Sequence, residues 1–73
     1  MIDISNGGFN FKYKTNKNWG HIEIESDNIK GIIEINGGRI SKEQYFYSPG
    51  SYPNTAEGIA CRACVDEILG TDY

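Results

Sequence analysis

The residues best equipped for chemistry are Cys61 and Cys64, which form a CxxC arrangement with Arg62 and Ala63 between them. Such a pair is a redox centre when its first thiol lies at a helix N-terminus, where the dipole lowers the thiol pKa. Here a helix is expected to start at Asn54, which puts the first cysteine about two turns inside it, on the apolar side. A zinc site needs four ligands, whereas the chain has two cysteines and one histidine. We expect buried core thiols, with a redox or metal role as the alternative.

His21, the single histidine, is the other candidate for acid–base chemistry. The expected register puts it on the solvent face of a sheet, beside Lys12 and Glu34. General acid–base catalysis needs a second reactive group and an enclosed substrate. Glu23 and Glu25 are acids on the same face, but an open sheet encloses nothing. We therefore predict no enzyme, no cofactor and no metal site.

These residues must be positioned by a sheet whose turns the sequence marks. Asn-Gly steps at Asn6 and Asn36 lie between apolar residues, which is typical of two-residue hairpins. Further turns are expected at Asn16-Lys17 and Asp27-Asn28. The resulting cross-strand pairs are Ile4 with Phe9, Ile2 with Phe11, Phe11 with Ile22, Phe9 with Ile24, Ile22 with Ile33, Gly20 with Ile35, and Ile33 with Ile40.

This register gives the sheet an apolar inner face and a charged outer face. A slip of one residue would turn the apolar side chains to water, so the agreement between the turns supports the pairing. Opposite charges meet on the outer face at Glu25 with Lys30 and at Glu34 with Arg39, where each pair contributes up to ~1 kcal/mol. The inner face holds Ile2, Ile4, Phe9, Phe11, Tyr13, Gly20, Ile22, Ile24, Gly31, Ile33, Ile35 and Ile40.

Beyond Ile40 the alternation would direct Lys42 and Gln44 inward, so a bulge is expected there. Among the aromatic residues that follow, Phe46 is expected to cap the core. The prediction for the whole chain is one α+β domain, residues 1–73, with an antiparallel meander of about five strands and one C-terminal helix packed on one face. Its parts are the sheet (1–47), an aromatic Pro/Gly loop with a type II turn (48–53), the helix (54–69) and a tail (70–73).

The helix is expected to have Asn54 as its N-cap, with Glu57 completing a capping box, and to stop at Gly70. Gly20 and Gly31 would leave room for it to approach the sheet closely. Its apolar positions follow a helical stripe that should lie on the inner face. They are Ala60, Cys61, Cys64, Val65, Ile68 and Leu69.

Composition limits the classes of partner. The chain has 73 residues and a formal net charge of −3, which disfavours direct binding to nucleic acid or anionic membrane. No stretch approaches the roughly 20 apolar residues of a membrane span, and residues 1–10 lack the features of a secretory signal. Two cysteines do not make a disulfide framework. We expect a cytoplasmic protein.

Surface positions that the predicted core does not use are the candidates for contact with a partner. Tyrosine is favoured at protein interfaces, and the loop after the sheet is rich in it. Acidic residues at a helix C-terminus oppose the dipole, so stability does not explain them there. Trp19 is apolar on the outer face. The candidate contact residues are Tyr45, Tyr47, Tyr52, Asp66, Glu67 and Trp19.

Strands followed by the Ala- and Cys-containing helix of residues 55–64 faintly resemble the second half of a double-stranded RNA-binding domain. Such domains carry lysines at the helix start, where this chain has Asn54, Thr55 and Glu57. The chain therefore lacks the lysines with which such domains bind RNA phosphates.

In size, charge and architecture, the whole chain resembles small phage-encoded anti-defence proteins of the anti-CRISPR and anti-restriction type. The resemblance implies a non-enzymatic protein that inhibits a larger host complex by binding it, in the host cytoplasm. The alternatives are a self-assembling structural protein, pairing through residues 2–5 or 45–47, and a small nucleic-acid-binding domain.

Overall fold

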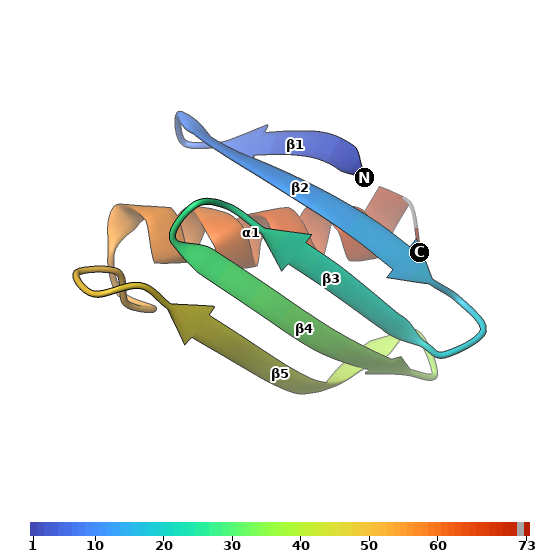
Figure 1. The fold of residues 1–73 in the computed structure, drawn as a ribbon. Helices are drawn as coiled ribbons and strands as arrows, with labels where there is room; N and C mark the ends of the chain where they lie inside the picture. The colour runs from blue at the N-terminus through green and yellow to red at the C-terminus, as the bar shows by residue number, and fades with distance from the viewer. Residues whose placement is uncertain (72) are drawn as a thin grey trace.

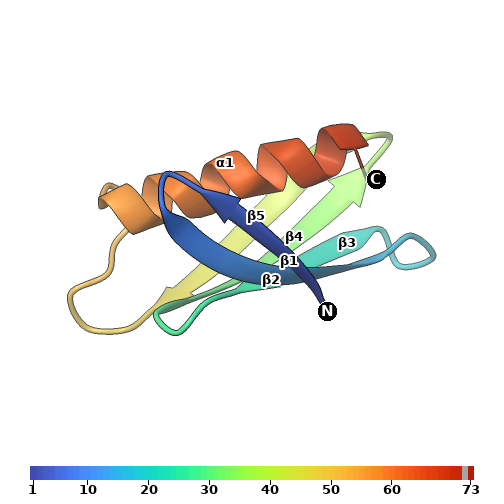
Figure 2. The same cartoon turned by 90° about the horizontal axis from the view of Figure 1, so that it is seen from above.

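The structure, a computed structural model, describes residues 1–71 and 73 of the chain. One antiparallel sheet in the order β1-β2-β3-β4-β5 carries the C-terminal helix on one face, which confirms the α+β meander (Figures 1 and 2). The elements are β1 (Ile2–Asn6), β2 (Phe9–Asn16), β3 (His21–Glu25), β4 (Ile29–Asn36), β5 (Arg39–Tyr47) and α1 (Ala56–Thr71).

The first and last hairpins turn on Gly-Gly pairs, not on the Asn-Gly steps expected from the sequence. Gly7 and Gly8 have φ values of 58° and 85°, and Gly37 and Gly38 have 63° and 77°. A type I′ turn needs positive φ at both central positions, which glycine adopts without steric cost. The registers of these two hairpins therefore differ by two residues from the predicted ones. The observed pairs are Ile4 with Phe11, Ile2 with Tyr13, and Ile35 with Ile40.

The β2–β3 connection occupies residues 17–20, so the pairing of β2 with β3 differs by four residues from the predicted pairing. Gly20 has a φ of 65°, and its carbonyl accepts a hydrogen bond of 2.6 Å from the Ile35 N–H. The predicted pair of Ile22 with Ile33 is confirmed. All these shifts are even, so the side chains of β1 to β4 keep their predicted face. The observed β2–β3 pairs include Tyr13 with Ile24 and Thr15 with Ile22.

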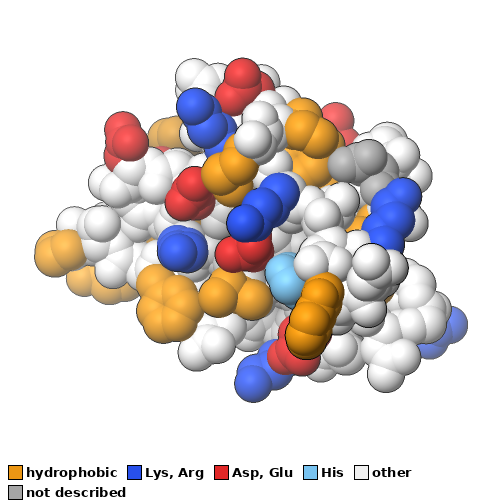
Figure 3. All heavy atoms as spheres, turned by 45° about the vertical axis from the view of Figure 1, so that its right-hand side comes forward, with side chains coloured by type: hydrophobic (Ala, Val, Ile, Leu, Met, Phe, Trp, Pro, Cys, Tyr) orange, Lys and Arg blue, Asp and Glu red, His pale blue; other side chains and the backbone are white. Residues whose placement is uncertain are grey.

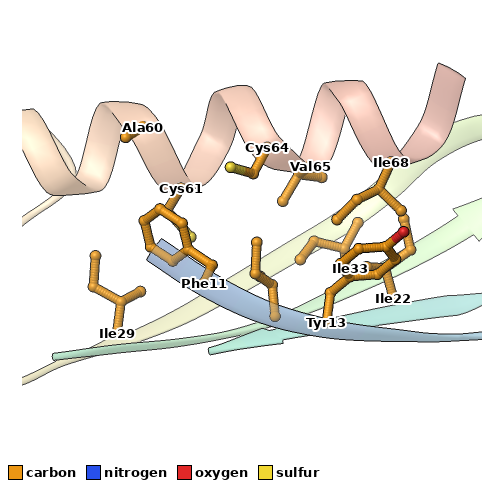
Figure 4. Close-up of a cluster of buried hydrophobic side chains, with 11 residues drawn as sticks. Phe11, Tyr13, Ile22, Ile29, Ile33, Ala60, Cys61, Cys64, Val65 and Ile68 are labelled. Carbon is orange, nitrogen blue, oxygen red and sulfur yellow. The ribbon is translucent and has the colours of Figure 1, made fainter. Parts of the chain in front are cut away.

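The core lies between the inner face of the sheet and the apolar side of α1 (Figure 4). Ile4, Phe9, Ile35 and Ile40 pack partly buried around it, while Ile2 is 52% exposed at the β1 edge. Ile29 joins the core although it was not predicted to. The buried hydrophobic side chains are Phe11, Tyr13, Ile22, Ile24, Ile29, Ile33, Ala60, Cys61, Cys64, Val65 and Ile68.

Helix α1 begins and ends two residues later than predicted. The Thr55 hydroxyl, not Asn54, caps it by accepting the Gly58 N–H at 3.2 Å. Gly58 is required because a Cβ there would collide with the carbonyl oxygen of Tyr52. The helix continues through Gly70 to Thr71, whose hydroxyl donates to the Glu67 carbonyl at 2.8 Å.

The expected bulge is confirmed, since the β4–β5 register shifts between Glu34 and Ile35, opposite Ser41. The Ser41 hydroxyl donates to the Glu34 carbonyl at 3.1 Å. The extra residue turns Tyr45 and Tyr47 inward and leaves Phe46 outside, 53% exposed. The prediction that Phe46 caps the core is therefore wrong.

Gly31 makes room for a side chain of β5 and not, as predicted, for the helix. Gly31 lies directly opposite Tyr45, and a Cβ there would be 2.8 Å from the Cε1 of the tyrosine ring. The expected free space is thus filled by an aromatic side chain. In the loop that follows, the Ser51 N–H donates to the Ser48 carbonyl at 2.9 Å and Gly50 has a φ of 90°, as expected for a type II turn.

Candidate interaction surface

The helix-free face of the sheet carries acids and bases on neighbouring strands, with both signs on β4. Figure 3 shows blue and red side chains interspersed on the surface. Glu25 lies opposite Lys30, as predicted, whereas Glu34 lies opposite Lys42 and not Arg39. Such direct pairs stabilise the register and balance the face internally. The bases of this face are Lys12, Lys14, Lys30, Arg39 and Lys42, and its acids are Asp3, Glu23, Glu25 and Glu34.

His21 belongs to this balanced surface. Its strand neighbours are Asn16 and Glu34, so the expected contact with Lys12 is wrong. The reason is the longer β2–β3 loop, which slides the histidine along β2. Its Nε2 lies 3.7 Å from the Glu23 Oε2, and the same oxygen lies 3.2 Å from the Lys14 Nζ. The carboxylate thus lies between the Lys14 ammonium and the His21 imidazole.

Away from this face, acids outnumber bases among the described residues. The two bases are Lys17, in the β2–β3 loop, and Arg62, on the helix. Glu57 accepts hydrogen bonds from Asn28, at 3.1 Å, and from Ser26, at 3.3 Å, and so joins the β3–β4 turn to the start of α1. The acids are Asp27, Glu43, Glu57, Asp66 and Glu67.

A polar chain of four side chains joins β5 to α1. The Tyr45 hydroxyl donates to the Glu43 Oε1 at 2.7 Å, and the Arg62 Nε lies 2.6 Å from that oxygen. The Arg62 Nη1 donates to the Asp66 Oδ1 at 2.6 Å. Burial alone would lower the arginine pKa, but the bond to Asp66 and the charge of Glu43 keep it above its ordinary value. We call these four residues the β5–α1 clamp.

Three of the predicted contact residues, Tyr45, Tyr47 and Asp66, already have contacts within the fold. Tyr45 and Tyr47 are half-buried against the core, with ring centroids 6.2 Å apart. Burial raises the pKa of both phenols, and the bond to Glu43 raises that of Tyr45 further. Asp66 is exposed but is occupied by Arg62. Glu43 and Arg62 were not predicted as site residues, because nothing local in the sequence shows their contact.

The exposed candidates lie apart. Trp19 is 79% exposed in the β2–β3 loop, and Tyr52 is 57% exposed in the β5–α1 loop. Figure 1 shows these loops at opposite ends of the sheet. Ile59, which the sequence did not single out, is 60% exposed on the outer side of α1. Tyr52 and Ile59 lie before and after the start of α1, where Glu57 is the acid of the first turn.

Glu67 lies elsewhere, on the side of α1 that approaches β1. It lines a shallow groove of about 630 Å³ together with Asp3, Ile4, Ser5 and Asn10. The groove follows the open edge of the sheet and has an acid on either side of it. We call it the β1 groove.

Both thiols are free and buried, as the sequence predicted. Burial, with the nearby Cys64 and Glu57, raises the pKa of Cys61 to about 12. Burial also raises the pKa of Cys64. Since the thiolate is the reactive form, this environment opposes the chemistry of a CxxC redox centre.

Within residues 1–71 and 73, no group of three or more His, Cys, Asp or Glu side chains is placed to hold a metal ion. No helix in this part of the chain is long and apolar enough to cross a bilayer. In comparisons with known proteins, no family model, curated protein or solved structure matches the chain.

Proposed function

We propose that this protein is a small non-enzymatic binding module whose helix side contacts a basic surface on a larger protein. One observation carries the proposal: the outer sheet face neutralises its own charge, whereas the helix side keeps an excess of acids. Charge that is balanced within the fold stabilises the register. Acidic charge in excess of the bases around it creates a field that attracts a basic partner.

The exposed apolar residues support the same surface. Tyr52 and Ile59 are more than half exposed at the start of α1, where they add contact area to the electrostatic attraction. The β1 groove is shallow and open, which favours binding of a protein surface over enclosure of a small substrate.

Within this class we propose an anti-defence role, in which the module occupies a nucleic-acid-binding surface of a host complex. Such a surface must be basic, because it neutralises phosphates. It is therefore complementary to the acidic helix side. The anti-CRISPR and anti-restriction resemblance supports this version through size, charge and architecture.

The test is affinity capture from lysate of the source cells, at low and moderate salt, with mass spectrometry as the readout. One bait is the wild type. The second carries Glu67→Lys and Tyr52→Ala, and a matched control carries Glu34→Lys and Phe46→Ala on the outer sheet face. We expect wild type and control to retain one stoichiometric partner that moderate salt weakens, and the helix-side variant to lose it.

Recovery of the bait alone, or equal loss in both variants, would overturn the proposed function. The anti-defence version has a further check on the captured complex. A nucleic-acid oligomer should compete with the module for the partner. If partner and oligomer bind together without competition, the anti-defence version is wrong although the binding module stands.

A further inference from the structure

The two edges of the sheet differ in how far they are protected from pairing with another strand. β5 has a bulge at Ser41, charged residues at Lys42 and Glu43, and Pro49 just beyond its end. Bulges, charges and prolines are the usual protection of an edge strand. β1 is an unbroken strand in which Ile2 and Ile4 flank a single charged residue, Asp3. Figure 1 shows it as the outermost strand on its side.

The hairpin geometry says which backbone groups of β1 point outward. A two-residue type I′ turn closes on a hydrogen-bonded pair, here Asn6 with Phe9. In an antiparallel pair, successive residues direct their N–H and C=O groups alternately toward the partner strand and away from it. The residues that direct both groups away from β2 are therefore Asp3 and Ser5. An added strand would find its donors and acceptors there.

The side chains around this edge define the chemistry of that strand. Ile2 is 52% exposed and Ile4 is partly buried, and both point to the helix side of the sheet. Asp3 lies on the opposite face, and Glu67 of α1 borders the groove from the helix side. Negative charge therefore flanks the vacant strand position on both faces. The base directly opposite Asp3 is Lys12, which also lies opposite Glu25, so one base is shared by two acids and offsets the charge of Asp3 only in part.

We infer that the β1 groove binds an extended basic segment of the partner protein by strand addition. The segment pairs its backbone with Asp3 and Ser5 and lays alternate apolar side chains over Ile2 and Ile4. Its basic side chains lie on the opposite face beside Asp3, and the charge of Glu67 attracts the segment from the helix side without direct contact. This inference rests on the proposed function and specifies the binding element of the partner.

Charge distinguishes this occupant from a second copy of the chain. Two β1 strands paired about a two-fold axis would bring both copies of Asp3 and both copies of Glu67 to one seam. Like charges directly opposite one another destabilise a strand pair. A basic segment removes that repulsion and converts it into attraction.

The test uses the full chain, labelled with ¹⁵N, and a seven-residue peptide of alternating lysine and valine with blocked ends. Two control peptides keep the length: one has glutamate in place of lysine, and the other is N-methylated at every backbone amide. We expect the lysine peptide to shift the amide signals of Ile2–Asn6. At about ten times its Kd, it should slow hydrogen exchange at Asp3 and Ser5 about tenfold. The control peptides should do neither.

Asp3→Asn should weaken the peptide severalfold, whereas the matched Glu34→Gln on the outer face should not. Binding that survives N-methylation is electrostatic and would overturn strand addition, as would shifts centred on β5 or no shift at all. Concentration-dependent shifts of the β1 amides without peptide would assign the edge to a second copy instead. Because partner capture is measured separately, a failed peptide with a retained partner overturns this inference alone.

Discussion

The edges at β1 and β5 are held against the same helix by different forces. β1 and its hairpin partner β2 lie against α1 through apolar packing, with Ile4 and Phe9 around the buried Phe11. β5 is joined to α1 by the β5–α1 clamp, in which Arg62 bridges Glu43 and Asp66. Both edges add apolar side chains to the core, Ile4 at β1 and Tyr45 and Tyr47 at β5, but only β5 is also joined to the helix by an ion pair.

This division has a consequence for binding. A clamp occupies the polar groups of an edge, so β5 has charges but offers few of them to a partner. Both outer strands leave backbone groups without a neighbouring strand, but β5 is interrupted by the bulge at Ser41. β1 is unbroken and keeps its pairing capacity at Asp3 and Ser5.

The largest expected effect compares two phenylalanines, one on each side. Phe11, 2% exposed, lies in the core beneath α1, whereas Phe46, 53% exposed, lies on β5 outside it. Phe11→Ala should lower the free energy of unfolding by about 3–5 kcal/mol, from lost burial and a cavity. Phe46→Ala should change it by less than about 0.5 kcal/mol. Urea unfolding of both variants measures the difference.

A chain of this length has a total stability of only about 4–11 kcal/mol, so Phe11→Ala is expected to be partly unfolded at room temperature. Phe11→Leu keeps most of the volume and provides a folded comparison. If Phe46→Ala cost as much as Phe11→Ala, Phe46 would be buried as deeply as Phe11, which would contradict its exposed position on β5.

The same two residues show how far sequence reasoning extends. Three of the four turns were placed with the wrong register, yet Phe11 was assigned correctly to the core. Each error was an even number of residues, because the apolar alternation constrains the face of a side chain but not its partner. Gly8 and Gly38 decide the actual pairing, since type I′ geometry favours glycine at both turn positions.

Phe46 was misassigned for a different reason. A bulge inverts every position after it, and its consequence depends on which residue is extra, here Ser41. The β5–α1 clamp was equally hidden, because Glu43 and Arg62 are distant in sequence. Local patterns therefore gave the fold class and the core, whereas long-range polar contacts, which decide what remains free on the surface, required the structure.

The next largest effect is a loss of stability at alkaline pH, caused by buried groups on β5 and the facing part of α1. Burial raises the pKa of Cys61 from about 9 to about 12, and it raises the pKa of Tyr45 and Tyr47 above their ordinary value. The unfolded chain therefore releases these protons first as pH rises. The contribution of these groups to the free energy of unfolding is complete below pH 9 and should fall between about pH 9 and pH 12. Each group contributes at most about 1.4 kcal/mol per pH unit.

Urea midpoints measured from pH 7 to pH 11 test this sign. Cys61→Ala removes one of the titrating groups and should make the decline shallower, although it lowers stability at pH 7 through lost packing. A midpoint that rises with pH across this window would contradict the burial of these groups. If the urea midpoint falls equally steeply with pH in the variant and the wild type, titration of Cys61 does not cause the loss of stability.

The smallest effect concerns the β5–α1 clamp itself. Arg62→Met keeps the length of the side chain but removes its charge. It should cost only about 0.5–1 kcal/mol, because the Arg62 side chain is 40% exposed and solvent screens its ion pairs. Glu43→Gln should cost a similar amount. Since both changes break the same contact, the double variant should cost less than the sum of the two.

Salt and hydrogen exchange distinguish the clamp from simple packing. The cost of Arg62→Met should shrink at 1 M salt, where charges are screened over about 3 Å. Exchange should quicken at β5 amides and stay unchanged at β1, because only β5 is joined to the helix through Arg62. A salt-independent cost would mean that the aliphatic part of the arginine stabilises the fold. Faster exchange at both edges would mean that the clamp positions the whole helix, and the two edges could then not be separated.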